Sequence, residues 1–180
     1  MISELDVLKI VSERLDTAQI PYMLTGSYAL AFYTTPRMTR DLDLVISLGA
    51  EDVGGIVKVF ESDFYIDSDA VRSAVLSQRQ FNLMHLESGI KVDLIVRKAA
   101  EYRQVEFARR NQVMFTGVKT WIATREDLIL SKLVWAKDSD SELQQRDVRS
   151  LIDASVDRQY IEQWAKRLGV DALLRKVVHE

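Results

Sequence analysis

Two aspartates separated by one residue form the pattern in this sequence with the clearest chemical meaning. Asp41 and Asp43 lie in an otherwise largely apolar segment, and side chains on a β-strand alternate between its two faces. A strand here places both carboxylates on one face and turns Leu42 and Leu44 toward a core. Carboxylates held together repel each other, and a divalent cation is the commonest reason to keep them so. An isolated Asp-Leu-Asp also fits a solvated strand face, so other features must decide.

A Gly-Ser pair and a third aspartate strengthen the interpretation as a reactive site. Gly26 and Ser27 precede Asp41 with thirteen residues between. Their turn is expected to end a strand and open a helix, where backbone N–H groups can hold a phosphate. Asp93 lies between apolar residues of a later predicted strand, where a lone buried acid is costly. If that strand neighbours the first, three carboxylates converge, enough for Mg²⁺ or for two ions acting on one phosphoryl group.

The elements that must position these residues form a mixed α/β part followed by an all-helical part. The patterns of apolar residues, glycine and proline predict strands at 22–24, 41–46, 64–66, 80–86, 90–96, 113–115 and 119–123. They predict helices that begin after Ser3 and at 28–33, 51–61, 67–77, 99–110, 125–137, 143–155, 158–168 and 170–177. The strands at 80–86 and 90–96 are joined by a short loop containing glycine, which indicates a hairpin.

Composition indicates an ordinary globular chain. Of 180 residues, 47% are hydrophobic and 28% charged, and the absence of cysteine excludes disulfides and thiolate metal sites. No apolar run approaches the roughly 18 residues that span a bilayer, and the acidic start is not that of a signal peptide. We therefore expect a cytoplasmic protein without a membrane partner. Residues 1–96 carry 8 basic and 14 acidic groups, and residues 97–180 carry 16 and 13, so the modestly basic half could help hold a polyanion.

Two charged residues in the helical part lie on faces that should be buried. The neighbours of Lys132 one helical turn away are all apolar, and Asp147 shares its face with Leu143 and Leu151. Charges on such faces are paired, extend to the surface, or line a site. A Lys132–Asp147 salt bridge between two helices is one interpretation. The other is a lysine that reaches nucleotide phosphates, oriented by Asp147.

These residues together resemble the nucleotidyltransferase superfamily of DNA polymerase beta. Its signature is an apolar residue, Gly, then Gly or Ser, a gap, and Asp-apolar-(Asp/Glu)-apolar. Leu24-Thr25-Gly26-Ser27 and Asp41-Leu42-Asp43-Leu44 match it, with Thr25 as a departure. Arg37-Met38-Thr39-Arg40-Asp41-Leu42-Asp43-Leu44 resembles the minimal bacterial branch related to abortive-infection type IV toxin nucleotidyltransferases, as do Arg125-Glu126-Asp127-Leu128 before Ser131-Lys132-Leu133 and the segment 145–151.

The resemblance implies a fold, a reaction and a set of site residues. The fold is α+β, a small mixed sheet flanked by helices, with a nucleotidyltransferase core over 1–123 and a helical region over 124–180 packed on it. The activity is Mg²⁺-dependent (or Mn²⁺-dependent) transfer of a nucleoside monophosphate, using two ions, from an NTP to an acceptor hydroxyl on tRNA, protein or a small molecule. Metal ligation falls to Asp41, Asp43 and Asp93, with Lys132 also catalytic. The expected nucleotide-binding residues are Gly26, Ser27, Arg37, Thr39, Arg40, Lys132 and Asp147.

Three functions remain open from the sequence. The first is an active nucleotidyltransferase, with a toxin–antitoxin or phage-defence role and a cognate antitoxin protein as a partner. The second is a nucleotide-binding regulatory partner without turnover. The third is an enzyme that modifies an aminoglycoside or lincosamide antibiotic. The sequence identifies neither the NTP nor the acceptor.

Overall fold

The computed structural model describes residues 2–35, 41–139 and 141–179. The described strands are β1 (Tyr22–Thr25), β2 (Leu42–Ile46), β3 (Phe64–Tyr65), β4 (Gln80–His85), β5 (Lys91–Val96), β6 (Asn111–Phe115) and β7 (Val118–Ile122). The helices are α1 (Glu4–Thr17), α2 (Gly26–Tyr33), the 3₁₀ turn η1 (Ala50–Asp52), α3 (Val53–Phe60), α4 (Ser68–Ser77), α5 (Glu101–Ala108), α6 (Arg125–Ser139), α7 (Glu142–Leu151), α8 (Arg158–Leu168) and α9 (Asp171–His179). The α+β class expected from the sequence is confirmed. Among the described helices, none is long and apolar enough to cross a lipid bilayer.

The chain divides into two compact units. Unit 1 comprises Met1–Ala29 and Arg37–Ala123, and unit 2 comprises Leu30–Pro36 and Thr124–Glu180. Unit 1 contains the whole seven-stranded sheet, in the order β3-β4-β5-β2-β1-β7-β6. The pairs β2–β5 and β1–β7 are parallel, and the other neighbouring pairs are antiparallel. The predicted hairpin is confirmed as β4–β5.

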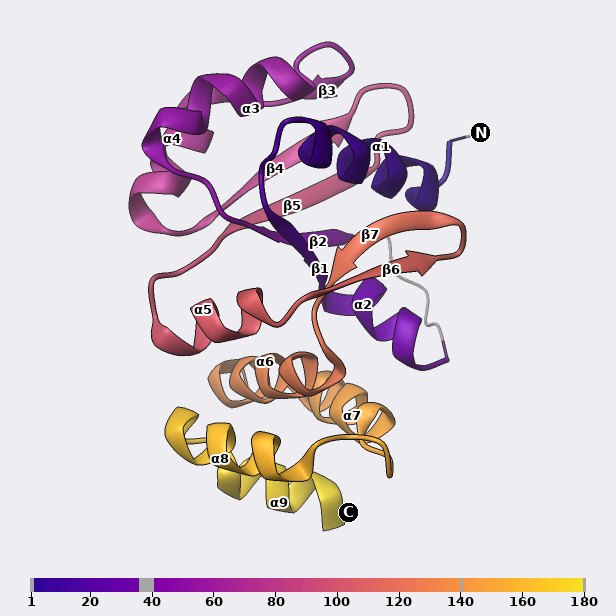
Figure 1. Cartoon of the computed structure of the whole chain (residues 1–180), viewed down its shortest axis with the longest axis vertical. Helices are drawn as coiled ribbons and strands as arrows, with labels where there is room; N and C mark the ends of the chain where they lie inside the picture. The colour runs from indigo at the N-terminus through magenta and orange to yellow at the C-terminus, as the bar shows by residue number, and fades with distance from the viewer. Residues whose placement is uncertain (1, 36–40, 140, 180) are drawn as a thin grey trace. The chain divides into compact units, whose positions relative to one another are not determined.

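Strict alternation along β2 distinguishes a buried face of the sheet from a more open face, although β1 is buried on both faces. On β2, Leu42, Leu44 and Ile46 are fully buried, while Asp43 and Val45 on the opposite face are only partly buried. Helices α1, α3 and α4 cover the buried face, and α5 lies on the other side of the sheet (Figure 1). On that second side Phe107 of α5 packs with Met23 and Val45. Helix α5 therefore covers one end of the open face and leaves the other end, around Asp43, uncovered by this helix.

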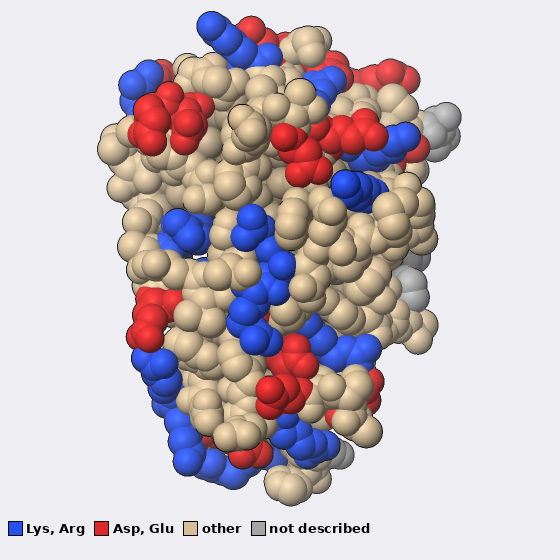
Figure 2. Space-filling view, in the orientation of Figure 1, with Lys and Arg blue, Asp and Glu red and all other residues tan. Residues whose placement is uncertain are grey.

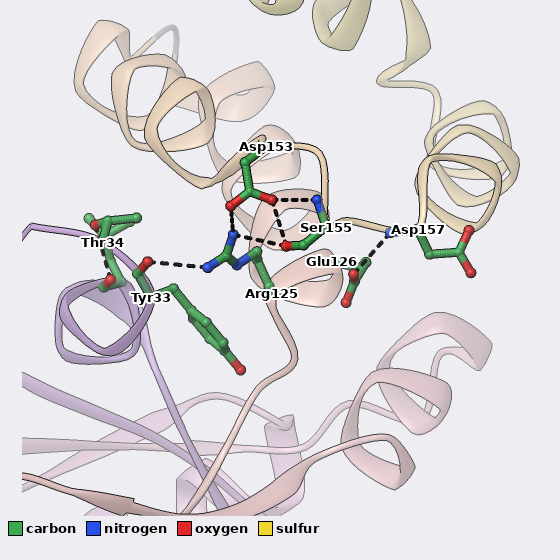
Figure 3. A network of polar contacts seen from close by, with 8 residues as sticks. Tyr33, Thr34, Arg125, Glu126, Asp153, Ser155 and Asp157 are labelled. Carbon is green, nitrogen blue, oxygen red and sulfur yellow. Dashed lines mark hydrogen bonds and ion pairs between the residues drawn. The ribbon is translucent and has the colours of Figure 1, made fainter.

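Unit 2 is built from the end of α2 and helices α6 to α9. Its loop between α7 and α8 corrects the prediction of one helix over 143–155. Helix α7 ends at Leu151, and Asp153 accepts hydrogen bonds from the backbone N–H and hydroxyl of Ser155, at 2.8 and 2.6 Å (Figure 3). Aspartate favours such local turns over a continuing helix. Asp157 then caps α8 by accepting a hydrogen bond from the N–H of Tyr160 at 3.0 Å. Contacts with Ser155 and then Arg125 lower the pKa of Asp153 to about 2.

Candidate active site

The open face of the sheet brings two of the predicted aspartates side by side. Strands β2 and β5 are parallel neighbours, and Asp43 is the register partner of Asp93, which confirms the expected adjacency of the two strands. Strand β2 begins at Leu42, so Asp41 lies just before the strand rather than in it, and its side chain is exposed. Asp93, Asp41 and Asp43 all raise the pKa of Lys91, so all three carboxylates lie within electrostatic reach of its ammonium group. The aspartates therefore gather at one end of the open face.

The Gly26 turn lies directly against this pair. Thr25 is the register partner of Asp43 on β1, and helix α2 starts at the next residue, Gly26. Gly26 has a φ of +64°, and a Cβ atom added there would lie 2.9 Å from Cγ of Asp43 and closer still to its Oδ2. Both the backbone conformation and the space require glycine. The beginning of α2, with Ser27 in its first turn, thus adjoins the carboxylates, as the phosphate-holding turn was expected to do.

Replacing Gly26 with alanine is expected to be more damaging than the same change at Gly89. Both residues have positive φ, +64° and +68°, but nothing lies within 4 Å of a Cβ at Gly89. Left-handed backbone costs a non-glycine residue about 1–2 kcal/mol, so both variants should lose about that much unfolding free energy in urea titrations. Gly26→Ala should lose further stability by displacing Asp43. Equal losses in the two variants would contradict the close packing of Gly26 on Asp43.

Lys91 is a member of the site that the sequence analysis missed. It stands two residues before Asp93 on β5, hence on the same face, and its Nζ lies 3.1 Å from Oδ1 of Asp93. The contact with Asp93 raises the pKa of Lys91 against the opposing effect of burial, and the charges of Asp93, Asp41 and Asp43 add to the increase. The i, i+2 spacing of Lys91 and Asp93 was the available signal. Lys91 therefore partly neutralises the acidic cluster.

The residues present fit a divalent cation of the hard, oxygen-preferring kind. Apart from the Lys91 ion pair, Oδ1 of Asp93 is buried without a hydrogen-bond partner among the described residues, and such an oxygen can serve as a ligand. In the part of the chain that the structure describes, no three acidic or histidine side chains already enclose an ion position. Mg²⁺ is usually held by one or two carboxylates with waters and substrate phosphates. Asp43 and Asp93, with Asp41 beside them, meet that requirement.

In unit 2, Lys132 and Asp147 form a buried ion pair. Nζ of Lys132 lies 2.7 Å from Oδ2 of Asp147 and donates a hydrogen bond to Oε1 of Gln144 at 3.0 Å. The side chains of Lys132 and Asp147 are only 3% and 6% exposed, as their apolar helix faces predicted. The pair joins α6 to α7, which is the first of the two interpretations of these residues. Nucleotide binding by Lys132 and Asp147 stays a prediction.

The remaining predicted nucleotide-binding residues, Arg37, Thr39 and Arg40, lie outside the described residues. The residues that the structure brings together are therefore Gly26, Asp43 and Asp93 with Lys91 in unit 1, and separately Lys132 with Asp147 in unit 2.

Comparison with solved structures identifies the fold. The antibiotic-resistance factor ANT(2'')-Ia aligns with a TM-score of 0.59 at 16% sequence identity, covering 97% of this chain and 96% of that one. An antigenic nucleotidyltransferase-like protein from Paracoccidioides brasiliensis gives 0.60 at 19% identity, covering 97% and 91%. The lincosamide antibiotic adenylyltransferase LnuA, bound to lincomycin, gives 0.55 at 13% identity, covering 83% and 96%. No protein-family model and no curated protein sequence matches the chain. The fold is that of the polymerase beta-like nucleotidyltransferases.

Proposed function

We propose that this chain is an enzyme that transfers a nucleoside monophosphate from an NTP to an acceptor hydroxyl, with divalent cations held by Asp41, Asp43 and Asp93. The observation that carries the proposal is the register pairing of Asp43 with Asp93 directly beside the Gly26 turn. A carboxylate pair facing the first turn of a helix supplies a cation site and a phosphate site within one substrate's reach. The shared fold with known nucleotidyltransferases supports the reaction class.

The chain's own residues have separate tasks in this reaction. The turn at Gly26 and Ser27 orients the phosphates through backbone N–H groups. The hydroxyl oxygen of the acceptor bonds to the α-phosphorus while Asp93 accepts the hydroxyl proton. The bond between the α-phosphorus and the oxygen that bridges it to the β-phosphate breaks, and pyrophosphate leaves. A divalent cation, which Asp41, Asp43 and Asp93 would hold, would supply neutralisation of the phosphate charge. Lys132 is the residue that the sequence resemblance assigns to the leaving pyrophosphate.

Incubation with each labelled NTP, Mg²⁺ and acceptor mixtures (total tRNA, cell protein and aminoglycosides or lincosamides) tests the proposal. We expect the wild-type chain to label one acceptor class and the Asp41→Ala/Asp43→Ala variant to lose the labelling. Equal labelling by both proteins would refute the proposal. NTP·Mg²⁺ binding in calorimetry without any product would instead support a regulatory partner without turnover.

An antibiotic acceptor is the second candidate, because proteins that share the fold include the antibiotic-resistance factor ANT(2'')-Ia and the lincosamide antibiotic adenylyltransferase LnuA. Drug-dependent pyrophosphate release is its signature. The toxin–antitoxin role and a cognate antitoxin partner rest on the sequence motif from Arg37 to Leu44 and on the segments 125–133 and 145–151.

A further inference from the structure

Two arginines in unit 1 share one aromatic ring. The guanidinium carbon of Arg110 lies 4.3 Å from the ring centroid of Phe107, and that of Arg97 lies 5.3 Å from the same centroid. Arg110 also stacks on Trp121, at 4.9 Å. The two guanidiniums are thus no more than about 10 Å apart, roughly one Debye length at 0.1 M salt, so their charges repel.

Neither arginine has a carboxylate partner among the described residues. The hydrogen bond from the Arg110 side chain goes to the carbonyl oxygen of Phe107, at 2.7 Å, and its Nε is buried without a partner. Burial, then the charge of Arg97, lowers the pKa of Arg110. Stacking on aromatic rings orients such cations but does not neutralise them. The unneutralised pair is therefore electrostatically suited to an anion.

The residues around Arg97 and Arg110 carry a net positive charge, which also favours an anionic ligand. Residues 97–110 contain five basic and two acidic groups, whereas residues 111–180 contain eleven of each and residues 1–96 are net acidic. The excess positive charge of the C-terminal half of the sequence thus lies in and around α5. Figure 2 shows Lys and Arg side chains around the region in which Figure 1 draws this helix, with acidic side chains at its outer edge. A local positive field on an otherwise acidic unit attracts a polyanion to this place.

The position of this pair separates it from the NTP phosphates. Asp93 and Arg97 lie four residues apart along β5 and its continuation, so their Cα atoms are about 13 Å apart at the usual rise of a strand. The Gly26 turn adjoins Asp43 at the carboxylate end, while Arg97 follows the opposite end of β5. A ligand that touches both places must be extended, with a hydroxyl at one end and an anionic group farther along.

We infer that Arg97 and Arg110 form a phosphate-binding site for the backbone of a single-stranded nucleic-acid acceptor, whose terminal hydroxyl reaches Asp93. Such a strand carries phosphates at regular intervals and ends in hydroxyls. Arginine matches phosphate oxygens with its planar fork of donors. The inference rests on the proposed function, since it names the acceptor of that reaction. An aminoglycoside, which is cationic, would be repelled from this site.

Salt-dependent binding of a labelled single-stranded RNA, measured by anisotropy in EDTA and without NTP, tests the site. Removing one arginine that binds a phosphate should reduce the slope of log K against log salt by about 0.7. We expect Arg97→Gln and Arg110→Gln each to lower the slope by about this amount and the double variant by about 1.4. Arg72→Gln on α4, an exposed arginine on the other side of the sheet, removes one charge and should leave the slope unchanged.

Substitution of each arginine by lysine distinguishes the loss of a phosphate contact from misfolding. Arg97→Lys and Arg110→Lys keep the positive charge and should keep most of the slope. If the Gln variants lowered the slope only by disturbing the fold, the Lys variants, which also lose the planar guanidinium, would lower it as well. An unchanged slope in the double Gln variant, or no RNA binding by the wild-type chain at about 50 mM salt, would overturn the site. Since this titration contains neither NTP nor cation, its failure is distinct from failure of nucleotidyl transfer. Transfer to an uncharged drug with no RNA binding would overturn this inference alone.

Discussion

Replacing Asp93 with asparagine is expected to lower the turnover rate of nucleotidyl transfer by about 10³-fold, while KM for the NTP changes by less than about tenfold. In the proposed reaction Asp93 both holds a cation and accepts the acceptor proton. Its loss should therefore raise the barrier by several kcal/mol, and each 1.36 kcal/mol is tenfold in rate. Under the proposed function, Asp41, Asp43 and the Gly26 turn would still hold the NTP in this variant, so KM should change little. The measurement is steady-state kinetics with the labelled NTP.

The fold should tolerate this change. Asparagine has the shape of aspartate, and the partner left behind, Lys91, has a side chain that is 41% exposed and can turn to solvent. The loss of such a partly exposed pair costs about 1 kcal/mol or less. Asn82→Ala is the matched control, because Asn82 is the β4 register partner of Asp93 and its side chain is exposed. Comparable rate losses in both variants, or turnover of Asp93→Asn within tenfold of wild type, would contradict a chemical role for Asp93.

The sheet and its acidic face could be predicted because their signals are local. Alternation along 42–46 and 91–96 separates buried leucine and valine from aspartate within a few residues, and the glycine loop between 80–86 and 90–96 identifies the hairpin. A register shift by one residue would bury the aspartates and expose the leucines. The pairing of Asp43 with Asp93 therefore follows once the two strands are neighbours.

The features that escaped prediction depend on three-dimensional proximity or on small local energies. The closeness of Arg97 to Arg110 depends on how α5, which lies between them in the chain, packs on the sheet, and no periodicity encodes this. The end of α7 at Leu151 was missed because turn-forming bonds at Asp153 outweigh the apolar spacing that suggested a longer helix. The i, i+2 spacing of Lys91 and Asp93 is visible in the sequence, but spacing alone does not show that the two side chains form an ion pair.

Replacing Lys132 with methionine is expected to lower the free energy of unfolding by about 3–5 kcal/mol, the cost of leaving one partner of a buried ion pair alone. Asp147 would keep a buried charge, with a side chain only 6% exposed, and Gln144 would lose its hydrogen bond from Nζ. Urea denaturation measures the loss. The ion pair between Arg175 and Asp171 on α9 provides the control, because its side chains are 63% and 34% exposed. Arg175→Met should cost about 1 kcal/mol or less.

The double variant Lys132→Met/Asp147→Leu separates the two interpretations of this pair. Replacing both charges by apolar groups of similar volume removes the uncompensated carboxylate, so most of the lost stability should return. If Lys132 also contacts the phosphates of the NTP, the restored fold will still show a KM for NTP raised tenfold or more, since each charge-assisted bond to phosphate is worth about 1.5–3 kcal/mol. Normal kinetics in the stable double variant would limit the pair to joining α6 and α7. A loss for Lys132→Met no larger than that for Arg175→Met would contradict even this structural role.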